Sequence, residues 1–330
     1  MARNPRPRIF VTQPIPASAL KRLRRIATVE VNPDDSRALG KRALLAAVRR
    51  NDILFALLHD RVDRDVLAAN PGLRAVASMA IETGYIDLAE ATRRRIPVTV
   101  IPPIVTEATA DLAFALMLAL ARRVVEGDRL VRKGGFPGGQ SNHLAGASVS
   151  GKVLGLVGGG GRIGKAVARR ARGFGMRVMY WGPRRKPAAE EKEAGLTYAP
   201  LDRLLAESDF VSIHSPLRPD TWHQIGAREL SLMKPGAFLI NTARGPIVDE
   251  AALVRALTLD RLGGAGLDVY EQEPKMDKVL WKMPNVVLTP HLGSAVAELR
   301  DVMANIVVDN IVALLDGRKP PNCVNPAVFG

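Results

Sequence analysis

Leu154-Gly155-Leu156-Val157, followed by Gly158-Gly159-Gly160-Gly161-Arg162-Ile163-Gly164, is the stretch that decides the fold. The first four residues are typical of a buried strand, and helix-forming residues continue to Arg172. Gly159, Gly161 and Gly164 match the pattern G-x-G-x-x-G, which permits a tight turn and a close approach of the backbone to a pyrophosphate. The helix N-terminus then offers N–H groups to the phosphates. We therefore predict a dinucleotide site at these glycines, Arg162 and Ile163.

The strand expected next, Met176–Trp181, indicates which dinucleotide binds. A carboxylate at its end would accept a hydrogen bond from the ribose 2′-hydroxyl of NAD. Gly182-Pro183-Arg184-Arg185-Lys186 stands there instead. Cations of this kind pair with a 2′-phosphate. The sequence therefore favours NADP, with Arg184 and Arg185 at the phosphate. The alternative is that the basic loop is only solvated and that NAD is bound by the backbone.

Outward from this motif, short apolar runs alternate with amphipathic stretches along the whole chain. This alternation is typical of βαβ units and a parallel sheet. We predict an α/β protein of two doubly wound parallel-sheet domains, a Rossmann-like cofactor domain (103–291) inserted in a flavodoxin-like substrate domain (1–102 and 292–330). The strands expected are Ile9–Val11, Ile53–Leu58, Pro97–Ile101, Val153–Val157, Val178–Trp181, Phe210–His214, Phe238–Asn241, Ala265–Val269 and Val286–Leu288.

Two long helices are expected beside these strands. The pattern from Glu107 to Arg132 predicts one continuous helix, and its apolar character on several faces predicts burial between the domains. A second helix is expected from about Ser294 to Leu315, crossing back to complete the first domain.

Composition narrows the class of protein. The length of 330 residues favours two domains. Cys323 is the only cysteine, which excludes an intramolecular disulfide and fits a reducing compartment. The basic start, Met1–Arg8, is followed by too short an apolar run for a signal peptide, and no stretch reaches the roughly 20 apolar residues of a membrane span. We expect a cytoplasmic protein without a membrane partner.

The net charge of +14 favours anionic partners. Nucleic acid is one candidate, but the arginines are scattered through expected helices and are not interleaved with aromatic residues. We therefore expect no nucleic-acid partner and a field that attracts small anions.

Three segments near expected strand ends carry residues suited to acid–base chemistry. Arg244 lies in Asn241–Gly245, Glu273 precedes Pro274, and His291 lies in Pro290–Ser294. Ligands of open α/β sheets bind at the carboxyl ends of the strands. Taken singly, each residue is more often a surface ion pair, a cap or a core residue.

With these residues the chain resembles the D-2-hydroxyacid dehydrogenase family over nearly its whole length, and within it the glyoxylate/hydroxypyruvate reductases. The matching segments are Thr106–Ala113, Gly151–Gly164 and the three just named. The resemblance implies hydride transfer between a nicotinamide dinucleotide and a small 2-keto or 2-hydroxy acid. His291 would give the proton, Glu273 would hold the ring and favour its cation, and Arg244 would bind the substrate carboxylate.

The resemblance also implies further contacts. Thr242 and Asp268 would help to hold the nicotinamide carboxamide, and Thr106 would approach the cofactor or the substrate. In the segment Ile213–Pro216, His214 would shape the adenine side, and Pro216 would contact the cofactor. A homodimer is implied, packed through the long Glu107–Arg132 helix.

Two departures from the family pattern stand out. The substrate loop, Ile81-Glu82-Thr83, has Glu82 where glycine is usual, and a carboxylate there would repel a substrate carboxylate unless it points away. The run Gly158–Gly161 is one residue longer than usual and either shifts the pyrophosphate or bulges outward.

The leading hypothesis is an NADP(H)-dependent reductase of glyoxylate or hydroxypyruvate. The alternatives are an NAD-linked dehydrogenase of a bulkier 2-hydroxy acid and a dinucleotide-sensing interaction protein without catalysis. We expect no metal, because no histidine pair has a ligand spacing on one helix face and hydride transfer needs none.

Overall fold

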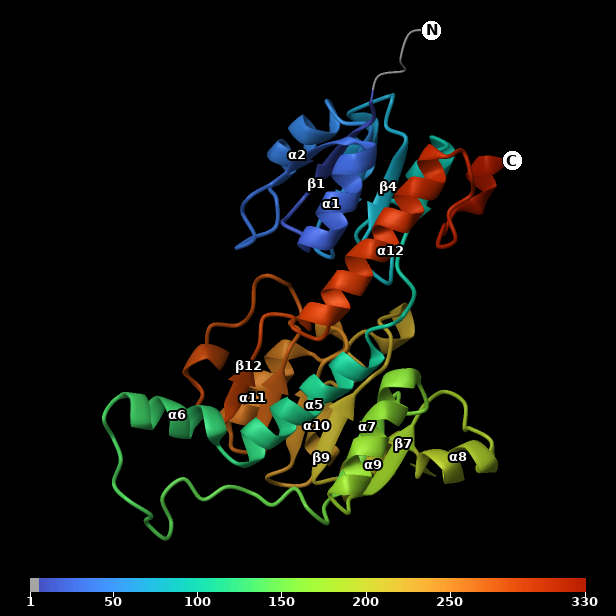
Figure 1. Cartoon of the computed structure of the whole chain (residues 1–330). Coiled ribbons are helices and arrows are strands. Elements are labelled where there is room, and N and C mark those ends of the chain that lie inside the picture. The colour runs from blue at the N-terminus through green and yellow to red at the C-terminus, as the bar shows by residue number, and fades with distance from the viewer. Residues whose placement is uncertain (1–5) are drawn as a thin grey trace, which may run out of the picture. The chain divides into compact units, whose positions relative to one another are not determined.

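The computed structural model describes residues 6–330. Residues 1–5, part of the N-terminal stretch in which we predict no signal peptide, lie outside the described residues. The chain divides into two compact units, Met1–Ile104 with Ala295–Gly330, and Val105–Ser294. Each unit is built on its own parallel sheet, so the predicted fold class is confirmed (Figure 1).

The first unit has a five-stranded sheet in the order β2-β1-β3-β4-β5. This is the order of flavodoxin-like folds. Its core is made of apolar residues from the buried strands and from the helices that cover them. Its elements are β1 (Arg8–Val11), α1 (Ala17–Ile26), β2 (Thr28–Val31), α2 (Lys41–Val48), β3 (Ile53–Ala56), α3 (Arg64–Ala68), β4 (Ala75–Ser78), α4 (Leu88–Arg93), β5 (Val98–Thr99), α12 (Ala297–Leu315) and η4 (Pro326–Phe329).

The helix α12 belongs to this first unit and packs against α1 and β4. The side chain of Arg22 on α1 forms an ion pair with Asp309 on α12 at 2.5 Å. The inner face of α12 buries a stripe of apolar residues that includes Val307, Val308 and Ile311. The last long helix therefore completes the fold that the first hundred residues begin.

The second unit has a seven-stranded sheet in the order β12-β11-β10-β9-β6-β7-β8. With β6 as its first strand, this is the Rossmann order extended by one strand. Its elements are α5 (Thr106–Ala121), α6 (Val124–Arg132), β6 (Val153–Val157), α7 (Arg162–Gly173), β7 (Arg177–Trp181), α8 (Ala188–Ala194), β8 (Thr197–Tyr198), α9 (Leu201–Glu207), β9 (Phe210–Ile213), η1 (Pro219–Thr221), α10 (Ala227–Leu232), β10 (Phe238–Asn241), η2 (Gly245–Ile247), α11 (Glu250–Thr258), β11 (Gly264–Leu267), η3 (Leu280–Lys282) and β12 (Val286–Leu288).

The prediction of one helix from Glu107 to Arg132 is wrong. The chain forms two helices, α5 and α6, separated at Arg122 and Arg123 (Figure 1). Arg123 has a left-handed backbone, with φ of 52°, and its guanidinium binds Glu126 at 2.8 and 2.9 Å. The apolar faces of α5 pack on α7 and on β10, β11 and β12 of its own unit. Its apolar character therefore reflects burial within the second unit.

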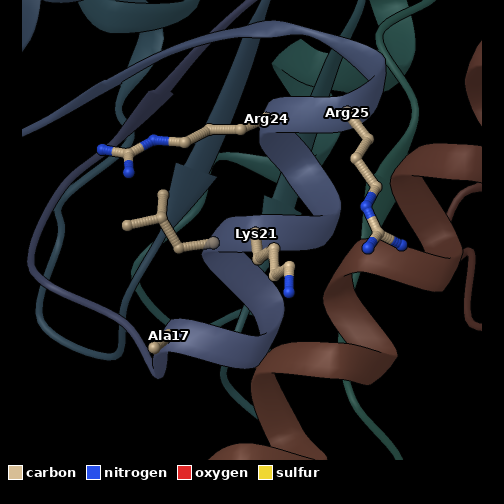
Figure 2. Close-up of a pocket in the computed structure, with 5 residues that line it drawn as sticks. Ala17, Lys21, Arg24 and Arg25 are labelled. Carbon is tan, nitrogen blue, oxygen red and sulfur yellow. The ribbon is translucent and has the colours of Figure 1, made fainter.

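No helix among residues 6–330 is long and apolar enough to cross a membrane. A shallow hollow on α1 gathers three cations, Lys21, Arg24 and Arg25, beside Ala17 and Leu20. Arg24 and Arg25 extend to opposite sides of the helix (Figure 2). Because these cations do not converge and the hollow holds no acid–base pair, we do not place the chemistry there.

Candidate active site

The glycine-rich turn connects β6 to α7 and requires the absence of side chains. Gly158 has φ of 80°, a left-handed conformation that favours glycine. A methyl group on Gly164 would lie 2.4 Å from the carbonyl oxygen of Gly159, so the start of α7 packs directly on the turn. Gly161, which precedes the helix, provides no side-chain cap. The first N–H groups of α7 therefore have no side-chain cap, which suits an anionic ligand.

The third glycine of the run, Gly160, lies against the side chain of Lys186. A methyl group on Gly160 would lie 2.9 Å from Cε of Lys186, so the side chain of this lysine runs against the turn. Sequence reasoning did not place Lys186 at the glycines, because the two positions are 26 residues apart. The structure thus places the third cation of the basic loop against the glycine turn.

The loop after β7 carries the predicted phosphate-binding residues. Arg184 and Arg185 are both exposed, and Gly182 is buried at the end of the strand. The Arg185 guanidinium forms two hydrogen bonds of 3.0 Å with Glu191 on α8. Sequence reasoning missed Glu191, since it lies on the following helix and no motif marks it.

The strands β10, β11 and β12 are neighbours in register, with Asn241 beside Leu267 and Leu267 beside Leu288. Parallel strands end at one edge of a sheet, so the segments that follow them gather there. Arg244 lies three residues beyond β10, and its Nη1 donates to the Ala243 carbonyl at 2.7 Å. His291 lies three residues beyond β12. The predicted catalytic residues Arg244 and His291 thus follow strands of one edge.

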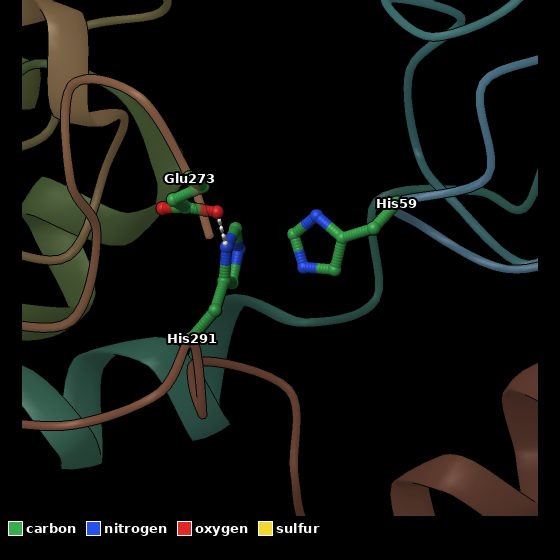
Figure 3. Close-up of side chains that lie close together, drawn as sticks. All are labelled: His59, Glu273 and His291. Carbon is green, nitrogen blue, oxygen red and sulfur yellow. Dashed lines mark hydrogen bonds and ion pairs between the residues drawn. The ribbon is translucent and has the colours of Figure 1, made fainter. Parts of the chain in front are cut away.

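The structure brings together two of the predicted catalytic residues. Nδ1 of His291 donates to Oε2 of Glu273 at 2.9 Å (Figure 3). The other carboxylate oxygen accepts the N–H of Tyr270 at 3.0 Å, which fixes the carboxylate. The side chains of His291 and Glu273 are only 20% and 13% exposed, so water screens the pair weakly. Because Nδ1 is bonded to Glu273, we expect a proton that the ring passes to a substrate to leave from Nε2.

Asp268 anchors the backbone around His291. It is fully buried, and its carboxylate accepts bonds from the Thr289 hydroxyl at 2.6 Å and from the N–H groups of Leu292 and Gly293 at 2.6 and 2.9 Å. Burial raises the pKa of Asp268. The N–H of His291 donates to the Asp268 carbonyl, and this contact accompanies the left-handed φ of 56° at His291. The family resemblance implied a carboxamide contact for Asp268 but not this internal role.

Two buried polar atoms beside the sheet edge have no hydrogen-bond partner among residues 6–330. They are Oγ1 of Thr242 and Nδ1 of His214. Nε2 of His214 lies 3.0 Å from the Ser212 hydroxyl, and burial lowers the pKa of His214 to about 4. A buried group without a partner is costly unless a ligand or water satisfies it. Thr242 and the glycine turn therefore fit a bound dinucleotide.

Two further residues predicted to contact the cofactor are Pro216 and Thr106. Pro216 is exposed after β9, and Thr106 is the first residue of α5. Thr109, one turn later on α5, donates to the carbonyl of Gly293 at 3.1 Å. The start of α5 is thereby tied to the segment that carries His291.

The predicted substrate loop of the first unit follows β4. Ile81 and Thr83 are half-buried, and Glu82 is exposed. The loop is held from both sides: Thr83 accepts the N–H of Ile86 at 2.7 Å, and Ile86 forms a parallel bridge with Val62. These bonds give the loop a defined conformation within its own unit.

Comparison with known proteins gives consistent results. Residues 114–293 match the NAD-binding domain of the D-isomer specific 2-hydroxyacid dehydrogenases. A glyoxylate reductase of Thermococcus litoralis is 46% identical over 328 residues, which cover 98% of each chain. A Thermus thermophilus protein of known crystal structure is 44% identical, with a TM-score of 0.88 over 96% of this chain and 99% of the other. An NADPH-dependent glyoxylate/hydroxypyruvate reductase from Sinorhizobium meliloti, solved with NADP and malonate, is 32% identical, with a TM-score of 0.79 over 98% of each chain.

Proposed function

This chain belongs to the D-isomer specific 2-hydroxyacid dehydrogenase family and is an NAD(P)-dependent dehydrogenase, and from that premise we propose that it reduces glyoxylate or hydroxypyruvate with NADPH. The observation that carries the proposal is the 2.9 Å bond between His291 and Glu273 beside the carboxyl edge of the sheet. A protein that only binds a dinucleotide has no need of such a proton donor.

The reaction divides the work among the three residues. A bound nicotinamide supplies the hydride that reaches the carbonyl carbon of the keto acid. His291 gives the proton to the carbonyl oxygen from Nε2 and recovers it from water. Glu273 holds the ring in one orientation and stabilises its protonated form by charge. In this proposal Arg244 binds the substrate carboxylate through its two-pronged guanidinium and polarises the keto group.

The substrate half of the proposal rests on relatives and on the loop. The relative from Thermococcus litoralis is a glyoxylate reductase, and the one from Sinorhizobium meliloti acts on glyoxylate and hydroxypyruvate. In this chain Ile81, Glu82 and Thr83 would border the substrate. Because Glu82 is exposed, its carboxylate has access to water, which reduces repulsion of a substrate carboxylate.

The preference for NADP(H) is supported by the end of β7. The strand ends at Trp181, and the loop that follows holds three cations; the first carboxylate after the strand is Glu190, on α8. The missing carboxylate removes the usual partner of the NAD ribose and the repulsion of a 2′-phosphate. The cofactor contacts proposed from the sequence, Gly159, Gly161, Arg162, Ile163, Gly164, Arg184, Arg185, Pro216, Thr242, Asp268 and Thr106, all belong to the second unit.

We also propose that the protein acts as a cytoplasmic homodimer, as the family resemblance implies. The short helix α6 supports this, because it buries none of its residues within the chain and leaves Val124 and Val131 each 55% exposed. Apolar side chains on an otherwise unburied helix are suited to a second copy of the same chain.

The test of the proposed function is steady-state reduction of a substrate series with NADPH and NADH in parallel. The series comprises glyoxylate, hydroxypyruvate, pyruvate and bulkier 2-keto acids. The proposal predicts the highest kcat/KM for glyoxylate or hydroxypyruvate with NADPH. A preference for NADH and a bulky acid would establish the alternative dehydrogenase, and cofactor binding without any turnover would establish a sensing protein.

A further inference from the structure

The loop 270–277, which follows β11 and carries Glu273, is fastened to the start of α11. Glu250, the first residue of α11, accepts the backbone N–H of Glu271 at 3.0 Å and the backbone N–H of Asp277 at 2.7 Å, one at each carboxylate oxygen. In return, the N–H of Glu250 donates to the carboxylate of Glu271 at 3.0 Å. Glu273 lies between the two points of attachment, so the loop is held on both sides of it.

The same helix start ends the segment that carries Arg244. Arg244 is six residues before Glu250 in the chain, and Gly245 follows it. A methyl group on Gly245 would overlap the carbonyl group of Tyr270 and lie 2.6 Å from the backbone nitrogen of Glu271. The two backbones are therefore in direct contact next to Arg244. The segment proposed to bind the substrate carboxylate thus packs on the loop proposed to support the proton donor.

His223 contacts both the segment and the loop. Its backbone N–H donates to the carbonyl of Pro246 at 2.9 Å, and Nε2 of its ring donates to the second carboxylate oxygen of Glu271 at 3.0 Å. The ring stacks on the indole of Trp222, with 5.2 Å between the ring centres, and the side chains of His223 and Glu271 are 35% and 21% exposed. The backbone of His223 has φ of 49°, a conformation that favours glycine. The engaged ring, and not the backbone, therefore gives a histidine its use at this position.

The pattern of hydrogen bonds gives both carboxylates an internal task. Each of the four oxygens of Glu250 and Glu271 accepts a bond from within the chain. A glutamine at either position would offer one acceptor oxygen to two donors, so the carboxylate is required in full. Glu271 also receives an N–H from the first turn of α11, where a negative charge is favourable. The pair therefore joins two segments of the chain and is already saturated by them.

We propose that Glu250, Glu271 and His223, here called the clamp, are positioning residues that hold the segment of Arg244 against the loop of Glu273. The inference rests on the proposed catalytic roles of Arg244 and Glu273. The clamp touches neither substrate nor cofactor; it sets where the carboxylate-binding group stands relative to the group that supports the proton donor. Loosening the clamp therefore impairs substrate binding and proton transfer together.

Glutamine variants test the clamp with little change of side-chain volume. Glu250→Gln leaves one of the two backbone N–H donors of the loop without an acceptor, and Glu271→Gln does the same to one of its own two donors. Asp209→Asn is the matched control, because Asp209 accepts the N–H of Val153 at 2.9 Å and binds Lys234 at 2.9 Å. It precedes β9 and so lies at the opposite, amino edge of the same sheet.

The assay is steady-state reduction of the best substrate of the series with the preferred nicotinamide cofactor. A misplacement of about 1 Å can lower a rate about 100-fold, so a partly loosened clamp should lower kcat and raise KM for the keto acid by about 3- to 10-fold each. Cofactor affinity should stay unchanged. Asp209→Asn should lower the melting temperature and leave kcat and KM within about twofold. Clamp variants that match this control would overturn the proposal.

Two double-mutant cycles separate positioning from a general loss of folded protein. If the clamp acts on kcat through Glu273, Glu250→Gln has little further effect on kcat in the Glu273→Ala background. If it acts on KM through Arg244, Glu250→Gln has little further effect on KM in the Arg244→Lys background. Equal losses in all backgrounds would show a merely structural role and contradict the proposal.

A second variant and a second readout keep the test decisive if the glutamine variants do not fold. His223→Gly removes the ring that binds Glu271 and suits the left-handed backbone, so it should fold and lower kcat/KM about two- to fivefold. Nitrogen NMR of the histidine rings, with His291 assigned by its loss in His291→Ala, needs no turnover. In the clamp variants the Nδ1 signal of His291 should move part of the way to its position in Glu273→Ala. An unmoved signal, or an unaltered kcat/KM in His223→Gly, would overturn the proposal.

Failure of this inference differs from failure of the proposed function. If Glu273→Ala leaves kcat unchanged and Arg244→Lys leaves KM unchanged, the proposed catalytic roles are refuted, whatever the clamp variants do. If these two variants have their expected effects and the clamp variants behave like Asp209→Asn, only the clamp is refuted.

Discussion

Replacement of Glu273 by glutamine isolates the charge of the carboxylate from its shape. The glutamine oxygen can still accept from Nδ1 of His291, so the ring keeps its orientation. A hydrogen bond to a charged group contributes roughly 1.5–3 kcal/mol, against about 1 kcal/mol for a neutral pair. The pair is mostly buried, with exposures of 20% and 13%, so little is lost to screening. The difference, roughly 1–2 kcal/mol, predicts a kcat lowered about 5- to 30-fold.

The assay is glyoxylate reduction at saturating NADPH, with Glu273→Ala as the companion variant. Alanine removes both the charge and the acceptor, so its kcat should fall further than that of glutamine. NADPH affinity, measured by fluorescence titration, should stay unchanged in both. A Glu273→Gln enzyme within twofold of the unchanged rate would refute the role of the charge, and a change confined to KM would refute its place in proton transfer.

Three further predictions follow from the geometry. Gly164→Ala would set a methyl group 2.4 Å from the Gly159 carbonyl oxygen, and we expect it to weaken NADPH binding more than about tenfold. Gly173→Ala in the same helix meets no atom within 4 Å and should stabilise the protein by up to about 1 kcal/mol; equal effects of the two on binding would contradict the close approach. Burial lowers the pKa of His214 from 6.5 to about 4. Between these two pH values the unfolded chain binds a proton at His214 and the folded chain does not. The free energy of unfolding therefore falls as the pH drops from 6.5 to about 4, by up to about 3 kcal/mol. Urea unfolding of His214→Gln should show a smaller loss over this interval, and parallel curves would count against the burial effect. Arg244→Lys keeps the charge but not the two-pronged geometry, so KM for glyoxylate should rise about tenfold with NADPH affinity unchanged, and an unaltered KM would remove Arg244 from the carboxylate site.

The second unit was predictable because the turn at its first strand requires glycine at particular positions, and these glycines form a short motif in the sequence. Gly158 and Gly164 occupy positions where a side chain is strained or collides, and the pattern around them identifies the turn and its helix. The strand ends were equally predictable, since Arg244 and His291 each lie three residues after a strand that is recognisable as a mainly apolar run. In each case the information is contained within about ten residues.

The break between α5 and α6 left no comparable signal. The break falls at two arginines, Arg122 and Arg123, with no glycine or proline to mark it, and helix-forming residues continue on both sides. The left-handed conformation of Arg123 is accompanied by its ion pair with Glu126. An arginine–glutamate pair at this spacing is also ordinary within a helix, so sequence reasoning had no means to distinguish the two.

The roles of the basic loop were hidden for a different reason. Arg184, Arg185 and Lys186 look equivalent in sequence, and a phosphate-binding role was assigned to the first two. The pairing of Arg185 with Glu191 depends on the position of α8, and the contact of Lys186 depends on a turn 26 residues earlier. Such distinctions arise from tertiary contacts and require coordinates.

The most direct measurement is the rate of glyoxylate reduction by His291→Ala, with NADPH affinity determined on the same preparation. A positioned general acid contributes about 10²- to 10⁴-fold to a reaction of this kind. The account predicts a rate lower by that factor, with NADPH bound as tightly as in the unchanged protein. A His291→Ala enzyme that reduces glyoxylate within a few-fold of the unchanged rate would contradict the assignment of His291 as the proton donor.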